Sequence, residues 1–230
     1  MTELRILSAG AVKRGVTQMA EAYARQYGTP VKVEFATAPE LRKRITMGET
    51  ADVLIAPPAL MDEFAIAERI IQQSRRCVGR SRMGVVVHEQ SAIKDVAEVE
   101  ALKQMLNAAE VVVHNRASSG IYAAKLLKDL ALAEGVRERV VIVDTGAAVM
   151  EYVAAHPAAI GLGQISEIRV LIDKGLPIRM AGPLPDAVQN VTRYEAAAVA
   201  GRAFEPAAIA LAAFLATPEA KAVFTATGID

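Results

Sequence analysis

The sequence predicts an α/β protein of two lobes, each built on a mainly parallel β-sheet with helices on its faces, joined by two crossover strands. Short apolar runs rich in Val and Ile alternate with stretches of helical periodicity along the chain. This alternation is interrupted before the middle and again before the last quarter, which indicates a chain that leaves one lobe and later returns to it. Its 230 residues, 53% of them hydrophobic, suffice for two domains of about a hundred residues, each with a core.

Strand-loop-helix units are expected throughout the first part of the chain. The strands are expected at residues 5–8, 31–35 and 51–56, each followed by a helix with apolar residues at helical spacing. Gly28 is placed to end the first helix. Pro39 is placed to begin the second, because the first residue of a helix needs no N–H group. Strands that alternate with helices in this way form parallel sheets.

The alternation continues after a long strand expected at residues 77–87. The further expected elements are, in order, helix 95–106, strand 111–113, helix 119–132, strand 140–143, helix 147–155, strand 159–164, a short helix capped by Ser166, strand 194–199, and helices 206–215 and 218–225. We therefore assign residues 1–80 and 191–230 to lobe 1 and residues 81–190 to lobe 2.

Loops at the carboxyl ends of the expected strands are the candidate ligand sites, because open α/β sheets bind ligands at this edge. The loops at residues 8–11, 36–38, 115–119 and 144–147 each follow a strand and precede a helix. The first N–H groups of a helix have no partner within it, so a helix start attracts anions. We expect these loops to face one ligand cleft between the lobes.

The composition narrows the ligand to a small molecule. Lys and Arg total 26, as do Asp and Glu, so the chain has no net charge with which to hold nucleic acid. The single Cys77 and the histidines, His88, His114 and His156, show no metal-ligand spacing, and the sequence contains no cofactor-binding fingerprint. We expect a small anionic ligand, and no cofactor, metal, nucleic acid or membrane insertion.

Several segments occur in one order along the chain: Ser8-Ala9-Gly10-Ala11, residues 35–41, Ala51-Asp52-Val53-Leu54-Ile55, Ser119-Gly120-Ile121-Tyr122 and Gly161-Leu162-Gly163. In order and spacing they resemble the molybdate-binding branch of the periplasmic solute-binding proteins, which have the type II periplasmic-binding-protein fold. The segment from Phe214 to Gly228 is similar as well, so the resemblance covers nearly the whole chain. It implies the extracytoplasmic component of an ABC importer.

The location expected from the sequence differs from the one that this resemblance implies. The N-terminal residues lack the charged segment, apolar segment and cleavage site of a signal peptide, and no apolar run approaches the roughly 18 residues of a membrane span. As written, the chain is expected in the cytoplasm. If a signal peptide has been trimmed away, we expect the periplasm, with an ABC permease as partner.

The resemblance also implies how an oxyanion is held: by serine hydroxyls of the first two loops, N–H groups of the second lobe and a tyrosine hydroxyl. The corresponding positions are Ala11, Ala38 and Gln164, which carry no hydroxyl. Each lost hydrogen bond to a charged ligand is worth roughly 1.5–3 kcal/mol. Arg116 lies in a loop that should meet the ligand, and a guanidinium can bind a carboxylate through two hydrogen bonds. We therefore prefer a carboxylic acid as ligand.

The predicted ligand-binding residues come from the loops named above and from the end of strand 159–164: Ser8, Gly10, Ala11, Thr37, Ala38, Arg116, Ser118, Ser119, Gly120, Gly146, Ala147 and Gln164. The first hypothesis is a solute-binding domain whose lobes close on the acid. The second is an isomerase of a small unsaturated di- or tricarboxylic acid, with His114 or Glu40 as proton-transfer base. Molybdate or tungstate binding and a ligand-sensing module are further alternatives.

Overall fold

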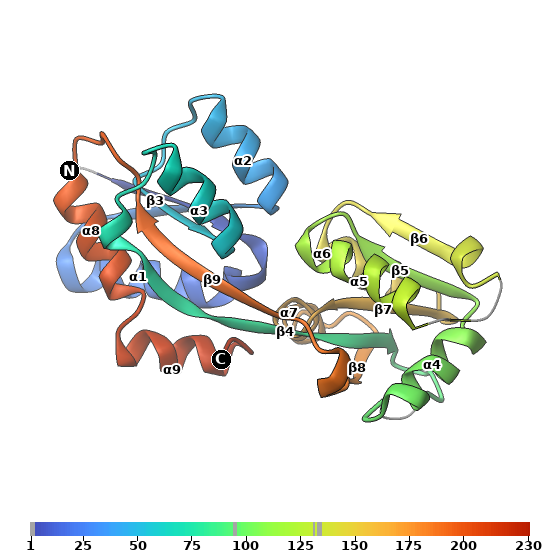
Figure 1. Ribbon diagram of the computed structural model, residues 1–230. Helices are drawn as coiled ribbons and strands as arrows, with labels where there is room; N and C mark the ends of the chain where they lie inside the picture. The colour runs from blue at the N-terminus through green and yellow to red at the C-terminus, as the bar shows by residue number, and fades with distance from the viewer. Residues whose placement is uncertain (1–2, 94–95, 131, 133–134) are drawn as a thin grey trace. The chain divides into compact units, whose positions relative to one another are not determined.

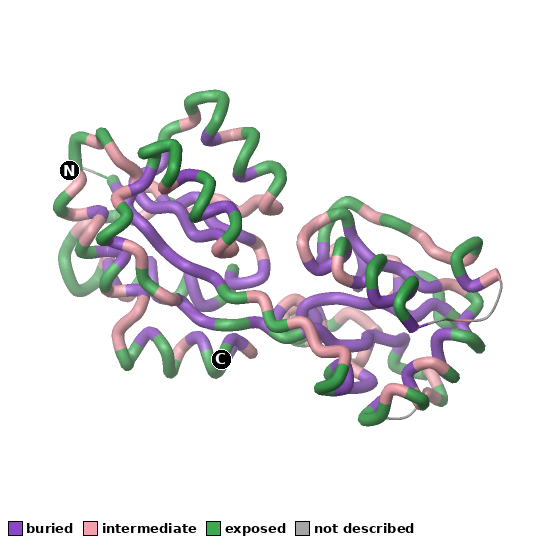
Figure 2. The backbone as a smooth tube through the Cα atoms, in the orientation of Figure 1, coloured by how far each residue is buried: buried purple, intermediate pink, exposed green. Residues whose placement is uncertain are grey.

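The computed structural model describes residues 3–93, 96–130, 132 and 135–230. The chain divides into two compact units, unit 1 with Met1–Arg80 and Arg193–Asp230, and unit 2 with Ser81–Thr192. The boundaries fall within strands β4 (Arg76–His88) and β9 (Val191–Ala198), so both strands pass from one unit into the other. Strand β3 (Val53–Ala56) in unit 1 and strand β7 (Ala159–Gln164) in unit 2 are buried along their whole length (Figure 2).

Unit 1 contains a sheet in the order β2-β1-β3-β9, flanked by helices (Figure 1). Strand β1 pairs in parallel with β2 and β3, and β9 runs antiparallel to β3. The strand bounds are Leu4–Ala9 (β1), Val31–Ala36 (β2) and Val53–Ala56 (β3). The helices are η1 (Gly10–Val12), α1 (Lys13–Tyr27), α2 (Ala38–Thr46), α3 (Pro58–Ile66), η2 (Gln72–Ser74), α8 (Glu205–Phe214) and α9 (Pro218–Ala226).

Close packing of α1 against α9 depends on Gly15. A Cβ atom at Gly15 would lie 2.3 Å from a ring atom of Phe224, so only glycine lets the two helices approach this closely. The apolar face of α1 and the buried residues of α8 and α9 belong to one core with the strands of unit 1. Gly28 ends α1 in the left-handed conformation, with φ of 66°, as the sequence predicts.

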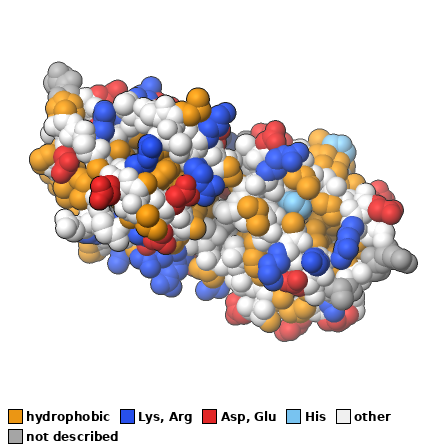
Figure 3. Space-filling view, turned by 45° about the horizontal axis from the view of Figure 1, so that its top comes forward, with side chains coloured by type: hydrophobic (Ala, Val, Ile, Leu, Met, Phe, Trp, Pro, Cys, Tyr) orange, Lys and Arg blue, Asp and Glu red, His pale blue; other side chains and the backbone are white. Residues whose placement is uncertain are grey.

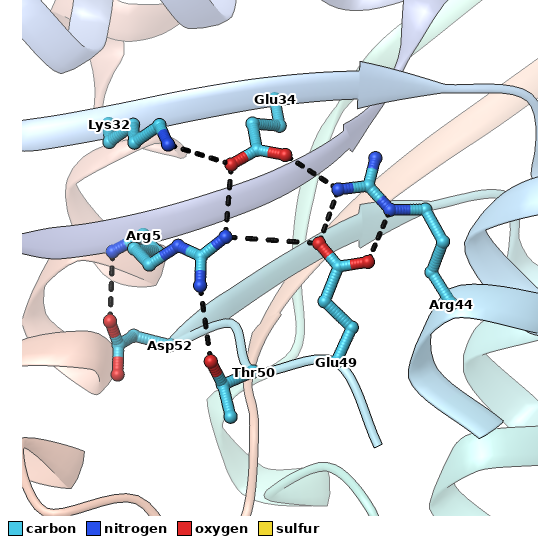
Figure 4. Close-up of polar contacts among 7 residues, drawn as sticks. All are labelled: Arg5, Lys32, Glu34, Arg44, Glu49, Thr50 and Asp52. Atoms are coloured by element: carbon cyan, nitrogen blue, oxygen red, sulfur yellow. Dashed lines mark hydrogen bonds and ion pairs between the residues drawn. The ribbon is translucent and has the colours of Figure 1, made fainter. Parts of the chain in front are cut away.

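A network of charged side chains joins β1, β2 and the carboxyl end of α2 in unit 1 (Figure 4). Glu34 accepts hydrogen bonds from Arg44 at 2.6 Å and from Arg5 at 3.0 Å, and it pairs with Lys32 at 3.2 Å. Arg44 also pairs with Glu49. These cations, Arg44 foremost, hold the pKa of Glu34 at about 2, well below its ordinary value. The network therefore ties two strands to a helix.

Unit 2 contains a mixed sheet in which β7 pairs with β4 and β5, β5 pairs with β6, and β4 pairs with β8. The strands are β5 (Val111–Asn115), β6 (Val140–Val143), β7 (Ala159–Gln164) and β8 (Ile178–Pro183). The helices are α4 (Val99–Ala108), α5 (Ser118–Asp129), η3 (Arg137–Arg139), α6 (Gly146–Ala155), α7 (Ile165–Asp173) and η4 (Asp186–Val188). Two buried clusters pack against this sheet, one containing Val112 of β5 and the other Val113, whose side chains alternate in direction.

The predicted α/β class is confirmed, and several details of the prediction are corrected. Strand β8 was not predicted. Ser166 does not cap α7, because the helix starts at Ile165 and Gln164 is the residue before it. The helix expected at residues 95–106 begins at Val99 within the described chain, while its expected first residue lies outside the described residues.

Among the described residues no single helix is long and apolar enough to cross a membrane. Helices α8 and α9 reach that length and apolar composition only when taken together, and the pair is bent by 59°.

Candidate functional site

The carboxyl ends of parallel strands lie on one edge of each sheet, and in both units this edge delivers helix starts. In unit 1, Ser8 is buried near the end of β1, and its hydroxyl donates to the carbonyl of Ala9 at 3.1 Å. Gly10 and Ala11 form the short η1 that leads into α1. Thr37 precedes α2 without a side-chain cap bond, and Ala38 is the first residue of that helix. These predicted residues share one edge of unit 1.

The start of α5 in unit 2 is fixed by Asn115, the last residue of β5. The Asn115 Oδ1 atom accepts hydrogen bonds from the N–H groups of Ala117 at 2.8 Å and Gly120 at 3.2 Å. The Asn115 amide group also donates to the Ser119 hydroxyl at 3.1 Å. The N–H groups of Ser118 and Ser119, in the first turn, have no partner within the helix. Asn115 therefore orients a helix start that can still donate to an anion.

Gly120 is required at this helix start by its distance from β5. A Cβ atom at Gly120 would lie 1.6 Å from the carbonyl oxygen of Asn115, closer than any two nonbonded atoms can approach. Residue 120 can therefore only be glycine unless the backbone shifts. The sequence pattern placed Gly120 at the site for its N–H group, whereas the structure shows that its missing side chain is what brings the helix to the strand end.

Arg116 lies between β5 and α5, and its guanidinium is exposed. Its Nε atom donates to the Oδ1 atom of Asp144 at 3.1 Å. Asp144 lies in the loop after β6. Both side chains are largely solvated, 66% and 88% exposed, so the pair is weak. Arg116 is thus available to an added anion at the same strand-end edge, in competition with Asp144.

The start of α6 combines a hydroxyl cap with a carboxyl group from another helix. The Thr145 hydroxyl accepts the N–H of Ala148 at 3.1 Å. Gly146, the first residue of α6, is so close to Glu167 that an added Cβ would lie 2.0 Å from the Glu167 Oε2 atom. Glu167 belongs to the first turn of α7. The carboxyl group of one helix therefore lies against the start of the next.

Burial raises the pKa of Glu167 to about 7. Within the described part of the chain, Glu167 has neither a hydrogen-bond partner nor an ion-pair partner. The buried Glu195 of unit 1 is different, because it pairs with Arg75 and with Arg193. Glu167 is consequently a carboxyl group that can take up or release a proton near neutral pH.

The start of α7 carries buried polar groups with spare hydrogen-bonding capacity. Gln164 is 2% exposed, and its amide nitrogen donates to the Thr192 hydroxyl at 3.3 Å. Its Oε1 atom is buried without a hydrogen-bond partner among the described residues. The hydroxyls of Ser166 and Ser81 lie 3.3 Å apart, and both are buried. An unpartnered buried oxygen is costly, and a donor on a ligand would satisfy it.

The bases named from the sequence are not equally placed. His114 is 3% exposed, and its Nδ1 atom lies 2.9 Å from the carbonyl oxygen of Asn115, so the ring is held within the sheet region of unit 2. Glu40 is exposed in the first turn of α2, in unit 1. The His114 ring thus lies beside the start of α5, whereas Glu40 belongs to the other unit. Both remain predictions as bases.

A groove of about 460 Å³ lies at the opposite edge of unit 2. It is lined by α4 residues such as Met105 and by residues next to the amino ends of β5 and β7, including Glu110 and Ala158.

The described residues include no cluster of His, Cys, Asp or Glu suited to a metal ion. Both signs of charge occur on the face of each unit seen in Figure 3. An anion is therefore offered backbone donors and single side chains rather than a cationic surface.

Within unit 2 the structure places on one edge the predicted residues Arg116, Ser118, Ser119, Gly120, Gly146, Ala147 and Gln164. Sequence reasoning placed Asn115 and Thr145 in the loops of this edge without naming them as site residues, named Ser166 only as a helix cap, and missed Glu167. Asn115 and Thr145 could have been found, since an Asn or Thr just before a helix commonly bonds its first N–H groups. Glu167 could not, because its surroundings depend on Gly146, which is remote in sequence.

The chain is similar in sequence and in fold to several known proteins. The family model for bacterial extracellular solute-binding proteins matches residues 4–230. The aconitate isomerase of a Pseudomonas species is 28% identical, over 100% of this chain and 88% of that protein. The periplasmic molybdate-binding protein of Azotobacter vinelandii superposes with a TM-score of 0.82 at 16% identity, covering 99% of this chain and 98% of that one. The tungstate ABC transporter protein of Geobacter sulfurreducens gives 0.75 at 14% identity, covering 97% and 98%.

Proposed function

The chain belongs to the bacterial extracellular solute-binding proteins, and from this premise we propose that it binds a small carboxylic acid at the helix starts of unit 2. One observation carries the proposal: Arg116 lies on the same strand-end edge as the starts of α5 and α6. The helix starts attract any small anion. The guanidinium adds a planar pair of donors that matches a carboxylate.

The choice of a carboxylic acid over molybdate or tungstate rests on the side chains available. Ala11 and Ala38 at the starts of η1 and α2 offer no hydroxyl, and Gln164 offers an amide. The buried Oε1 atom of Gln164 can accept only from a donor, such as a hydroxyl or a protonated carboxyl group. A fully ionised inorganic oxyanion would leave this oxygen unpartnered. As a solute-binding protein, the chain would deliver its acid to an ABC permease.

Calorimetric titration tests this proposal directly. The panel is molybdate, tungstate, sulfate, and di- and tricarboxylic acids, each titrated at low and high salt. We expect a carboxylic acid to bind more tightly than any of the inorganic oxyanions. Sub-micromolar molybdate binding with no carboxylic acid binding would contradict the proposal.

Substitution of Arg116 tests the residue that sets the preference. Arg116→Ala is expected to weaken binding of the carboxylic acid more than tenfold, because a charge-assisted pair of hydrogen bonds is lost. Arg137→Ala is the matched control, since Arg137 is exposed in η3 before the amino end of β6. Equal affinities of the two variants would remove Arg116 from the site.

A second candidate function is isomerisation of an unsaturated tricarboxylic acid on this same site. It is favoured by the full-length similarity to an aconitate isomerase, at 28% identity. Such an isomerase needs the acid to be held by its carboxylates and a base to move one proton. Incubation of the protein with cis- and trans-aconitate, followed by proton NMR, tests it. Interconversion at a rate proportional to protein concentration supports the enzyme, and unchanged spectra of a bound ligand would reject it.

A further inference from the structure

We propose that Glu167 is the group that removes and returns the proton when the chain isomerises a bound unsaturated tricarboxylic acid, an inference that rests on the second candidate function above. The residues named from sequence, His114 and Glu40, then have no proton-transfer role. Contacts, burial and charge at the starts of α6 and α7 carry this assignment.

Glu167 is positioned beside a helix start that can bind an anion. Glu167 lies in the first turn of α7, and its carboxyl group reaches across to the first residue of α6. Residue 146 must be glycine for this, since a Cβ atom there would lie 2.0 to 2.6 Å from the Glu167 carboxyl atoms. A ligand carboxylate bound by the start of α6 would therefore lie beside the Glu167 carboxyl group.

The Glu167 carboxyl group has no structural partner among the described residues. The two strongly buried carboxylates of the described chain do have one: Glu195 pairs with Arg75 and Arg193, and Asp52 accepts the N–H of Arg5 at 2.8 Å. Glu167 makes no such bond. A half-buried carboxyl group without a cation is unfavourable for stability, and such groups are common at functional sites.

The ionisation of Glu167 also suits this role. Burial raises the pKa of Glu167 to about 7, and the charged residues of α6 and α7, namely Glu151, Arg169 and Asp173, are not among the causes of that shift. The partial positive charge at the start of α6 acts in the opposite direction and favours the carboxylate. Near neutral pH a substantial fraction of Glu167 is ionised and can accept a proton, and the carboxylic acid formed in this step can return it.

One carboxyl group can carry out both proton transfers of the isomerisation, and the reaction needs no cofactor. The Glu167 carboxylate takes a proton from the methylene carbon next to a ligand carboxylate. The C–H electron pair becomes the new C=C bond, and the former π pair moves to the carbon that was the vinylic CH. That carbon takes the proton back from the Glu167 carboxylic acid. One C–H bond breaks, one forms, and no electrons are gained or lost.

The two alternative bases, His114 and Glu40, are less suitably placed for proton transfer. His114 lies in β5 with its Nδ1 atom at hydrogen-bond distance from a backbone carbonyl, so one ring nitrogen is committed to the fold. Glu40 is exposed and adjoins the start of α2 in unit 1. His114 contacts the backbone carbonyl beside the start of α5, whereas the Glu167 carboxyl group lies directly against the first residue of α6.

The experiment compares Glu167→Gln, Glu167→Asp and the exposed control Glu138→Gln, using cis- and trans-aconitate as probes. We expect Glu167→Gln to lower kcat by about 10²–10⁴-fold while the Kd from calorimetry changes only a few-fold. Glu167→Asp should restore part of the rate, and Glu138→Gln should match the wild type. The wild-type rate should rise with pH through about 7, and this limb should disappear in Glu167→Gln.

A second readout separates the possible failures. In D₂O, wild-type protein should exchange the ligand's methylene protons for deuterium, and Glu167→Gln should not. If Glu167→Gln turns over or exchanges the ligand at the wild-type rate, Glu167 is not the base, although the protein is still an isomerase. Binding without exchange or isomerisation in the wild type would overturn both. Thermal unfolding of each variant ensures that a lost rate is not a lost fold, and Gly146→Ala, which displaces the Glu167 carboxyl group, should reproduce the loss.

Discussion

Two carboxylates, Glu34 in unit 1 and Glu167 in unit 2, show opposite uses of the same side chain. Glu34 is surrounded by Arg44, Arg5 and Lys32, and its pKa is held at about 2 (Figure 4). Glu167 is half-buried and pairs with no cation among the described residues, and its pKa is raised to about 7. The first arrangement stabilises the fold at neutral pH. The second costs stability there, which is the pattern expected where a group is kept for function.

The starts of α5 and α6 in unit 2 also differ from those of α1, α2 and α3 in unit 1. In unit 1, α1, α2 and α3 begin without a side-chain cap bond, and α2 and α3 begin with a proline in the first two positions. In unit 2, Asn115 and Thr145 bond the first N–H groups of α5 and α6. Side chains that orient a helix start leave its remaining N–H groups in a fixed direction. Unit 2 is therefore the half better prepared to hold an anion.

The largest expected effect comes from breaking the helix start in unit 2. Gly120→Ala should destabilise the protein by about 3 kcal/mol or more, because the new Cβ atom would meet the Asn115 carbonyl and β5 and α5 must separate. Urea unfolding followed by circular dichroism measures it. Ser118→Ala, in the same turn but half-buried, is the control and should change stability by less than about 1 kcal/mol. A stable Gly120→Ala variant would show that the helix can retreat freely.

The next effect is a gain in stability at the proposed functional residue. A carboxyl group whose folded pKa is raised above its ordinary value of 4.5 destabilises the folded state progressively as pH rises from 4.5 to about 7. Glu167→Gln should therefore match the wild type in stability below pH 4.5 and exceed it by about 1–3 kcal/mol above pH 7. Unfolding free energies measured across this range check the sign. A variant that loses stability with rising pH relative to wild type would contradict it.

The opposite sign is expected for Glu34. Its folded pKa of about 2 lies below its ordinary 4.5, so its contribution is complete above pH 4.5 and is lost as pH falls toward 2. Because the side chain is 30% exposed, solvent screening limits the loss in Glu34→Gln at pH 7 to about 1 kcal/mol. The difference between variant and wild type should shrink below pH 4. A constant difference down to pH 2 would mean that packing, rather than charge, accounts for the loss.

Particular elements show how much of the fold and of the candidate site could be predicted from the sequence. Strands β6 and β7 were predicted with their observed ends, and Gly28 ends α1 as predicted, because apolar runs and positive-φ glycines are local signals. Strand β8 was missed, since its pairing with β4 depends on the tertiary structure. At the candidate site the helix starts were predictable from strand-loop patterns. The partners of individual side chains, such as Asp144 for Arg116, were not.

The smallest expected effect concerns that pair and refines the proposed carboxylate preference. Asp144 competes with an added carboxylate for Arg116, at an Nε to Oδ1 distance of 3.1 Å. Because both side chains are largely exposed, Asp144→Asn should change the free energy of unfolding by less than about 0.5 kcal/mol. Freed from this competition, Arg116 should bind the acid about two- to fivefold more tightly, and less so at high salt, where the charges are screened.

Calorimetry of Asp144→Asn beside Asp129→Asn checks this last prediction. Asp129 pairs with Lys125 near the far end of α5, so its loss removes the same charge without touching the strand-end edge. A general gain in affinity from removing negative charge would appear in both variants, whereas release of Arg116 would appear only in the first. A fall in affinity for Asp144→Asn would mean that Asp144 orients the guanidinium toward the ligand. Asp144 would then position the Arg116 guanidinium by accepting its hydrogen bond, as Glu34 does for Arg5 and Arg44 in unit 1.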